Sequence, residues 1–249
     1  MPISALPMSY CGPPPLPENL WERWNFDPVL LAAMAMVIAA FLWLRRDATP
    51  RERWSFGLGM ATLAVIFISP LCALTVALFS ARVVHHVLLV AIAAPLLAFA
   101  VVSTVRGHSI DRLLGPLALL HTATFWLWHA PDAYTAALSS TPIYWLMQIT
   151  LLGTATALWV AIVAAPAGRA IAALLALTVQ MGLLGALLVF SGQPLYLPHL
   201  TTTIAFGLDP HADQQLAGLI MWVPASLPYI GVALMRLIAW LGGSEAVQS

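Results

Sequence analysis

Charged residues are scarce in this sequence. Only 8% of its 249 residues are Asp, Glu, Lys or Arg, against roughly 25% in soluble domains, whereas 61% are hydrophobic. Such a chain has too few polar side chains for a water-exposed surface, so a soluble globular fold is excluded. Stretches close to the ~20 apolar residues that a membrane-crossing helix needs predict an all-α integral membrane protein embedded in the lipid bilayer.

Lysine, a basic surface and a cysteine framework are also lacking. All ten basic residues are arginines and the formal net charge is zero, so no basic patch proposes a nucleic-acid partner. Two cysteines are too few for a disulfide framework, and because Cys11 lies in a polar tail and Cys72 in an apolar stretch, each is assessed alone. The first residues lack a basic start followed by an apolar core, so no cleavable signal peptide is predicted.

Hydropathy predicts a bundle of seven transmembrane helices. The predicted spans are Pro28–Leu44, Phe56–Phe79, Val84–Val102, Leu113–Trp128, Ile143–Ala164, Ala170–Phe190 and Gln215–Trp240. A Pro-rich tail, 1–27, precedes this domain of residues 28–241, and a short tail, 242–249, follows it. A kink is expected at Pro70. The proline-rich connection 191–213 is expected to form an ordered cap across the mouth of the bundle.

The arginines orient the predicted bundle. Seven of them lie in every second connection: Arg45, Arg46, Arg51, Arg53, Arg106, Arg112 and Arg169. The connections 129–142 and 191–214 contain no Arg or Lys. Since Arg and Lys mark cytoplasmic loops, the N-terminus is predicted outside and the C-terminus in the cytoplasm.

This orientation gathers the histidines on one side. Five fall at the outer face: His85, His86, His129, His199 and His211. His121 lies about 12 Å of helix rise below His129, and only His108 falls at the cytoplasmic face. Cys11 and Met8 are also predicted outside. Imidazole and sulfur side chains are therefore expected to collect at the outer face.

His85 and His86 are adjacent at the start of a long apolar run. Adjacent helix residues point about 100° apart, so one ring is expected to face into the bundle and the other toward a neighbouring helix or the headgroups. His86 is favoured as the inward ring. The alternative for either is an interfacial histidine that caps the helix start.

"WLWHAPDAY" places His129 at the end of a helix, because Ala130 precedes Pro131 and leaves the helical region. Capping of the helix C-terminus by the imidazole is one interpretation. In the other, His129 is a metal ligand and Asp132 orients its ring through the second nitrogen. An ionisable His121 within a span indicates function, although a neutral ring bonded to a carbonyl is the alternative.

"GLDPHADQQLAGLIMW" opens the last predicted span with Asp209, His211 and Asp213. Acidic residues at a helix N-terminus are favoured by the macrodipole, so Asp213 is interpreted as a cap or as a group that orients a ligand. Arg82 is expected to pair with one of these carboxylates, in a structural role.

Imidazole, thiol and thioether groups shielded from water suit Cu(I) better than harder cations. The nearby Met34, Met36 and Met147 are interpreted as packing residues. Copper is therefore the predicted metal.

Several stretches resemble one protein family. They are "YCGPPPLPENLWERWNFDP" (10–28), "HHVLLVAIAAPLL" (85–97), "FWLWHAPDAYTAAL" (125–138), "YWLMQITLLGTATALWVAI" (144–162) and "DQQLAGLIMWVPASLPYIG" (213–231). Taken in order, they resemble the multi-span CtaG family of cytochrome c oxidase assembly proteins. The resemblance implies a factor in the bacterial inner membrane that matures a haem-copper oxidase by handling copper for its catalytic subunit.

The resemblance implies that four polar positions of this chain match those of the family: His86 or His85, His129, Asp132 and Asp213. Family members carry histidines four apart before the third span and again in the fifth. This chain has Ala81 and Arg82 at the first place, and Tyr144 and Gln148 at the second. A metal site here must then be built differently, with Cys11 as a candidate ligand.

The leading hypothesis is a non-enzymatic assembly factor that binds Cu(I) at the outer face and passes it to oxidase subunit I. A periplasmic copper chaperone is a possible donor. The candidate metal ligands are His86, His129, His121, His85 and Cys11, and the candidate orienting residues are Asp132, Asp213 and His211. The alternatives are a membrane haem-binding protein resembling a b-type cytochrome, a metal-free scaffold for subunit I, and a proton-coupled transporter that uses His121.

Overall fold

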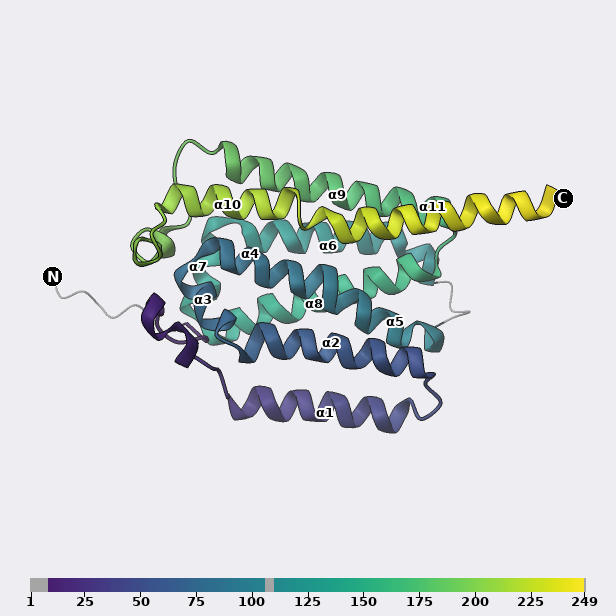
Figure 1. Ribbon diagram of the computed structural model, residues 1–249, viewed down its shortest axis with the longest axis horizontal. Helices are drawn as coiled ribbons and strands as arrows, with labels where there is room; N and C mark the ends of the chain where they lie inside the picture. Colours follow the sequence, from purple (N-terminus) through teal and green to yellow (C-terminus); the bar gives the residue numbers. More distant parts are fainter. Residues whose placement is uncertain (1–8, 106–109, 249) are drawn as a thin grey trace.

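The computed structural model describes residues 9–105 and 110–248, and within these ranges helices are the only regular secondary structure and no strand is present (Figure 1). Met8, Arg106 and His108, which entered the predictions above, lie outside the described residues. The all-helical fold predicted from composition is confirmed.

Eleven α-helices make up the described bundle. They are α1 (Pro28–Leu44), α2 (Pro50–Ile68), α3 (Leu71–Ala77), α4 (Phe79–Val87), α5 (Ala94–Val105), α6 (Leu114–His129), α7 (Pro131–Ser139), α8 (Thr141–Ala164), α9 (Ala167–Phe190), α10 (Pro210–Trp222) and α11 (Ser226–Gln248). A π-helical segment, Leu88–Ala93, joins α4 to α5. Short 3₁₀ helices occupy Pro17–Glu22, Ile110–Leu113, Leu197–His199 and Ile204–Phe206.

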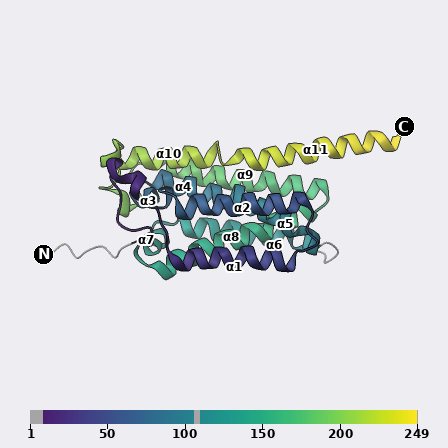
Figure 2. The same cartoon turned by 60° about the horizontal axis from the view of Figure 1, so that its bottom comes forward.

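The long helices lie side by side and the short elements gather at one end. Figures 1 and 2 show residues 9–27, α3, α7 and the connection before α10 together at this end, which we call the tail end. The α1–α2 turn lies at the opposite end, where α11 extends beyond its neighbours. The helix α11 continues to Gln248, across the boundary predicted at residue 242.

By length and composition, four helical runs of the described chain are able to cross a membrane: Phe79–Thr104, Thr141–Ala164, Ala167–Phe190 and Pro210–Gly242. The bent pair α2–α3 makes a fifth if it counts as one span. A helix overlaps each of the seven predicted segments, but α1 and α6 are short, with 17 and 16 residues. The chain is thus a membrane protein, while the seven-span count and the orientation stay predictions.

The kink predicted at Pro70 is present. The helix α2 ends at Ile68, α3 begins at Leu71, and the two are bent by 48°, because proline lacks the N–H that would continue the helix. This bend turns Cys72, in the first turn of α3, toward the N-terminal tail.

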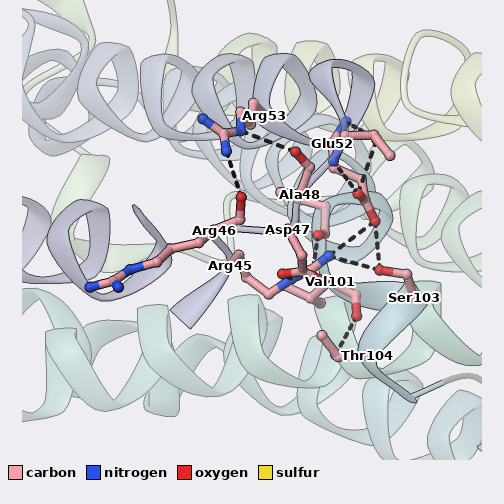
Figure 3. Close-up of polar contacts among 11 residues, drawn as sticks. Arg45, Arg46, Asp47, Ala48, Glu52, Arg53, Val101, Ser103 and Thr104 are labelled. Atoms are coloured by element: carbon pink, nitrogen blue, oxygen red, sulfur yellow. Dashed lines mark hydrogen bonds and ion pairs between the residues drawn. The ribbon is translucent and has the colours of Figure 1, made fainter. Parts of the chain in front are cut away.

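At the opposite end, a buried polar network joins three helices (Figure 3). The Arg45 guanidinium, just after α1, donates to the Ala100 carbonyl and the Ser103 hydroxyl of α5, each at 2.8 Å. It also pairs with Glu52 of α2 at 3.2 Å. Glu52 in turn forms a capping box with Thr49 at the start of α2. The α1–α2 hairpin is thereby fixed to α5.

The connection between α9 and α10 is ordered, as the proline pattern predicted. Tyr196 donates to the His129 carbonyl at 2.7 Å, and Thr202 donates to the Ala77 carbonyl at 2.6 Å. His199 and Thr203 are buried. This connection therefore lies over the tail end of α4, α6 and α7 as a cap.

Candidate functional site

The N-terminus of α4 is fixed by Asp213, which is buried at the start of α10. Its carboxylate accepts hydrogen bonds from the backbone N–H groups of Phe79 and Ser80, at 2.7 and 3.3 Å, and from the Ser80 hydroxyl. A carboxylate there satisfies unpaired N–H groups and complements the helix dipole. Asp213 is thus a cap, as predicted, but it caps a different helix from its own.

His86 of α4 faces His129 at the end of α6. Their ring centroids are 5.4 Å apart, with the ring planes at 80°. Both side chains are buried, at 1% and 3% exposure. The helix α6 stops after His129 because Ala130 adopts an extended conformation before Pro131, so the predicted helix end is confirmed. Trp128, its neighbour, donates to Thr150 of α8 and holds this end of α6 in place.

The tautomer of His129 leaves one nitrogen free. Its Nδ1–H donates to the Phe125 carbonyl at 2.7 Å, so Nε2 carries a lone pair. That Nε2 atom and both ring nitrogens of His86 are buried without a hydrogen-bond partner. Buried polar atoms are normally paired, and a ring held through one nitrogen by a carbonyl is the usual arrangement of a metal-binding histidine.

His85 points elsewhere. It packs edge-on against Phe67 of α2, with 5.1 Å between the ring centroids, and its centroid is 5.8 Å from that of His86. As the 100° argument requires, the two adjacent rings diverge, but both are buried and neither reaches the headgroups. Both nitrogens of His85 also lack a partner.

One helical turn nearer the tail end, Arg82 is buried without a carboxylate. Its side chain has 0% exposure, and its guanidinium makes no hydrogen bond of good geometry, although the Tyr134 and Tyr144 hydroxyls lie close to it. Its Cζ lies 5.3 Å from the ring centre of Tyr144 of α8, a cation–π contact. None of the ion pairs in the described chain includes Arg82, so the predicted pair with Asp209 or Asp213 is wrong: Asp213 caps α4, and Asp209 caps α10.

Gln148 lies one turn beyond Tyr144 on α8. It is 2% exposed, and neither its amide oxygen nor its nitrogen has a hydrogen-bond partner. Together, Arg82, His85, His86, His129 and Gln148 make a group of buried, unsatisfied polar side chains, which we call the histidine cluster.

The cap 191–209 closes the cluster from the tail end. His199 donates from Nδ1 to the Ala77 carbonyl, at 3.3 Å, and its Nε2 accepts from the Tyr134 hydroxyl at 2.6 Å. Desolvation lowers the pKa of His199 to about 4, and burial raises the pKa of Tyr134 above its ordinary value. Both groups are therefore neutral near pH 7, so neither His199 nor Tyr134 supplies a negative charge that would compensate the Arg82 cation.

The tail closes the other side of the cluster through a disulfide between Cys11 and Cys72. The prediction that each cysteine stands alone is therefore wrong: the bend at Pro70 brings Cys72 to the tail. As a disulfide, Cys11 offers no thiolate ligand. The Tyr144 hydroxyl points at Cys11 Sγ from 3.7 Å, and the Tyr10 ring stacks on the Tyr144 ring with 4.9 Å between centroids.

His121, Asp132 and His211 do not join the cluster. The Thr154 hydroxyl donates to the Thr150 carbonyl, so its oxygen accepts from Nδ1–H of His121 at 2.9 Å. His121 is also separated from His129 by two helical turns. Asp132 is exposed, and the Phe125 carbonyl occupies the nitrogen of His129 that Asp132 was predicted to orient. Nε2 of His211 bonds to the Ser191 carbonyl at 2.7 Å.

In the part of the chain that the structure describes, no group of three or more His, Cys, Asp or Glu side chains is arranged to hold a metal ion. The pair His86–His129 remains. Metal–imidazole bonds are about 2.0 Å long, so two rings that share an ion have nitrogens at most about 4 Å apart, which a 5.4 Å centroid separation permits. The donor set fits a metal of low coordination number.

Sequence reasoning missed Arg82 as a cation without a carboxylate and Gln148 as a member of the cluster, and it did not find the contact between Tyr134 and His199 in the layer above them. A signal for Gln148 was present. Tyr144 and Gln148 lie four residues apart on an apolar helix, and polar side chains at that spacing share a face that is turned toward the bundle interior.

The chain was compared with known protein families, curated proteins and solved structures. A family model described as "Cytochrome c oxidase caa3 assembly factor (Caa3_CtaG)" matches residues 35–242. No curated protein and no solved structure matches the chain. The matched range contains the whole histidine cluster, and it excludes Cys11.

Proposed function

The chain belongs to the caa3 cytochrome c oxidase assembly factor family, and on that premise we propose that it binds Cu(I) between His86 and His129 and delivers it to oxidase subunit I. Association with the oxidase follows from the family. The proposed role is non-enzymatic, because the chain holds and transfers an ion and changes no covalent bond of a substrate.

One observation carries the copper proposal. Two facing imidazoles are buried together with three ring nitrogens that lack hydrogen-bond partners, and leaving a polar group buried and unpaired costs roughly 1–3 kcal/mol. A bound ion would satisfy His129 Nε2 and one nitrogen of His86 at once. Imidazole is a good copper ligand, and a site shielded from water suits the cuprous ion.

Two ligands also suit delivery. An ion held by few protein ligands can be passed on when an incoming ligand of the partner replaces one of them, without release of free metal. His85, whose ring centroid is 5.8 Å from that of His86 and whose nitrogens make no hydrogen bond of good geometry, is the candidate for an additional contact during such an exchange. We propose that a periplasmic copper chaperone supplies the ion.

The proposal places the tail end outside the bacterial inner membrane. The arginine pattern favours seven spans with the N-terminus outside. The Cys11–Cys72 disulfide supports the same side, because disulfides persist in the periplasm and are rare in the cytoplasm. The histidine cluster would then open toward the compartment in which copper chaperones act.

The direct test is the copper stoichiometry of the purified full-length protein. We expect one Cu(I) per chain in the wild type and loss of that copper in His86→Ala and in His129→Ala. The matched control is His121→Ala, which removes a buried imidazole of the same helix α6 outside the cluster and should retain copper. A wild type without copper would remove the proposal, as would a variant series in which only His121→Ala loses it.

A cellular test separates copper delivery from a metal-free scaffold. In a strain that lacks this protein, the oxidase should contain haem and subunit I but lack copper, and His129→Ala should reproduce that defect. Loss of subunit I itself in the deletion strain, with full function of His129→Ala, would favour the scaffold. A Soret absorption band in the purified protein would favour the haem-binding alternative.

A further inference from the structure

We infer that the Cys11–Cys72 disulfide is a thiol–disulfide exchange site for a dithiol reductant, and that its reduction opens the histidine cluster. The exchange site stands on its own geometry. Only the statement that the opened cluster receives copper rests on the proposed function.

The disulfide is the principal tie between the tail and the bundle. In the described tail, the hydrogen bonds of residues 9–24 run within the tail, except for the bond from Tyr10 to Asp27 at the start of α1 and the sulfur contact between Cys11 and Tyr144. The bonds to α2 begin at Asn25. Tyr10 contacts α8 by ring packing. Cys11 contacts the bundle through its Sγ, which lies 3.7 Å from the Tyr144 hydroxyl, and through the covalent bond to Cys72. Loss of that bond leaves residues 9–16 without a covalent tie to the bundle, held by ring packing, the contact with Tyr144 and the hydrogen bond from Tyr10 to Asp27 at the start of α1.

The tail segment that this disulfide holds in place covers the histidine cluster. Tyr10 and Cys11 lie on Tyr144, and the Tyr144 ring lies over Arg82. His86 follows Arg82 by one turn of α4, and Gln148 follows Tyr144 by one turn of α8; both helices run inward from the tail end (Figure 1). One turn is about 5.4 Å, so His86 and Gln148 lie one turn farther into the bundle than Arg82 and Tyr144.

The two sulfurs are not equivalent to an incoming thiol. Cys11 is 9% exposed, whereas Cys72 is 0% exposed. A groove of about 320 Å³ borders Cys11 on both sides in the sequence, since Ser9 and Gly12 line it together with Val76, Leu138 and Thr202. The groove is lined by chain neighbours of Cys11 and by no immediate neighbour of Cys72, so an incoming thiol would approach the disulfide from the Cys11 side.

A dithiol is the one co-reactant that this exchange needs, because it supplies both the electrons and the protons. A thiolate of the reductant attacks Cys11 Sγ, the S–S bond breaks, and its electron pair leaves with Cys72, which takes up a proton. The second thiol of the reductant then attacks its own sulfur in the mixed disulfide and releases Cys11 as a thiol. The protein gains two electrons and two protons, and the reductant leaves as a disulfide.

The first test counts thiols in the full-length protein in detergent. Before reduction, alkylation with N-ethylmaleimide should add no mass. After treatment with dithiothreitol under native conditions, it should add two labels. A disulfide that resists the dithiol until the protein is denatured would overturn the inference.

The second test measures access to the cluster without any metal. Diethyl pyrocarbonate modifies neutral imidazole, and peptide mass spectrometry gives the rate at each histidine. Reduction should raise the rates at His86 and His129 at least about tenfold, as expected for local opening. His211, at the same end outside the cluster, and His121, deep in the bundle, should keep their rates. Equal rates at His86 and His129 in both redox states would overturn the inference.

The double variant Cys11→Ser/Cys72→Ser is the matched chemical control. It lacks the disulfide permanently, so its His86 should be modified at the fast rate with or without dithiothreitol. If this variant fails to fold, His121 will also be modified, and the comparison of oxidised with reduced wild type still decides. A folded double variant with a slow, wild-type rate would contradict the inference.

The last measurement links the exchange site to copper. After removal of the reductant and alkylation of the two thiols with N-ethylmaleimide, which keeps them from binding Cu(I), reduced protein should take up Cu(I) at least about tenfold faster than oxidised protein, again as local opening requires. Equal uptake in the two states would overturn the inference and leave the copper function intact. Uptake in neither state would remove the copper function, while the histidine modification rates still decide whether the cluster opens.

Discussion

The imidazole of His129 donates from Nδ1 to the Phe125 carbonyl, one turn earlier on α6, at 2.7 Å. This bond fixes the Nδ1–H tautomer of the neutral ring, so the Nε2 lone pair points away from its own backbone. His86 lies next to it, with 5.4 Å between the ring centroids. The end of one helix and the first turns of another thus create the candidate site.

The tautomer of His129 is testable by ¹⁵N NMR of histidine-labelled protein. We expect a protonated Nδ1 and an unprotonated Nε2 in the metal-free protein. Cu(I) should shift the Nε2 resonance and leave Nδ1 nearly unchanged, because the carbonyl keeps its proton. The resonances of His121, bonded to Thr154, serve as the control and should not move. A shift confined to Nδ1 of His129 would contradict the assignment.

Asp213→Asn should destabilise the protein by about 1–3 kcal/mol, the cost of leaving buried donors unpaired. The amide has one acceptor oxygen in place of two, so it cannot accept from both Phe79 N–H and Ser80 at the start of α4. The thermal midpoint in detergent measures the effect. Asp209→Asn is the control: it retains the oxygen that caps α10 and should cost less than about 0.5 kcal/mol. Equal effects of the two variants would argue against the cap of α4.

Stability should fall in acid through His199. Its pKa is about 4 in the folded protein, below about 6.5 in the unfolded chain, so the unfolded chain takes up the proton first as the pH falls. The folded state loses about 2 kcal/mol between pH 6.5 and 5 on this account. Below about pH 4 the folded ring is also protonated and can no longer accept from Tyr134.

The comparison is made with His199→Gln, which has no titrating ring. Its thermal midpoint should fall less than that of the wild type between pH 7 and pH 5, whatever the effect on stability at pH 7. Parallel pH profiles of the two proteins would show that His199 does not contribute.

Gly218→Ala should destabilise the contact between α9 and α10 by about 1–3 kcal/mol. A Cβ at Gly218 would lie 2.6 Å from the Gly185 carbonyl oxygen, a backbone atom, so the helices would have to separate. Close helix contacts in membranes depend on small residues. Gly153→Ala on α8 is the matched control, because a Cβ there meets nothing within 4 Å, and it should be neutral or slightly stabilising. A cost at Gly153 equal to that at Gly218 would refute the close contact.

At the opposite end of the bundle, Glu52→Gln should cost about 1–3 kcal/mol, because it leaves the buried Arg45 guanidinium with the exposed Asp47, at 3.5 Å, as its one carboxylate in the described chain. The double variant Arg45→Met/Glu52→Gln should recover part of that loss. Copper stoichiometry should not change in either variant, since the network in Figure 3 lies at the far end from the histidine cluster. Loss of copper in folded Glu52→Gln would contradict the independence of the two ends.

Much of the architecture was readable from local patterns. Apolar length predicted the helices, Pro131 predicted the end of α6, and Pro70 predicted the break between α2 and α3, because each depends on backbone chemistry within a few residues. The divergence of His85 and His86 followed from helix geometry alone. The prolines of 191–213 likewise predicted an ordered connection.

The partners of the polar groups were not readable. Asp132 lies three residues from His129, yet a carbonyl of the same helix holds the ring. Arg82 was assigned to a carboxylate and instead lies under Tyr144. In each case the sequence offered a nearby group of suitable charge, and the packing of a distant element determined which group came within bonding distance.

By itself, the sequence determined a helical membrane protein, because apolar composition and helix length act locally and leave no soluble alternative. Only the tertiary structure decided that His86 meets His129, that Cys11 joins Cys72 and that Asp213 caps α4. Those contacts join residues far apart in the chain, and their geometry exists only once α4, α6, α10 and the tail pack against one another.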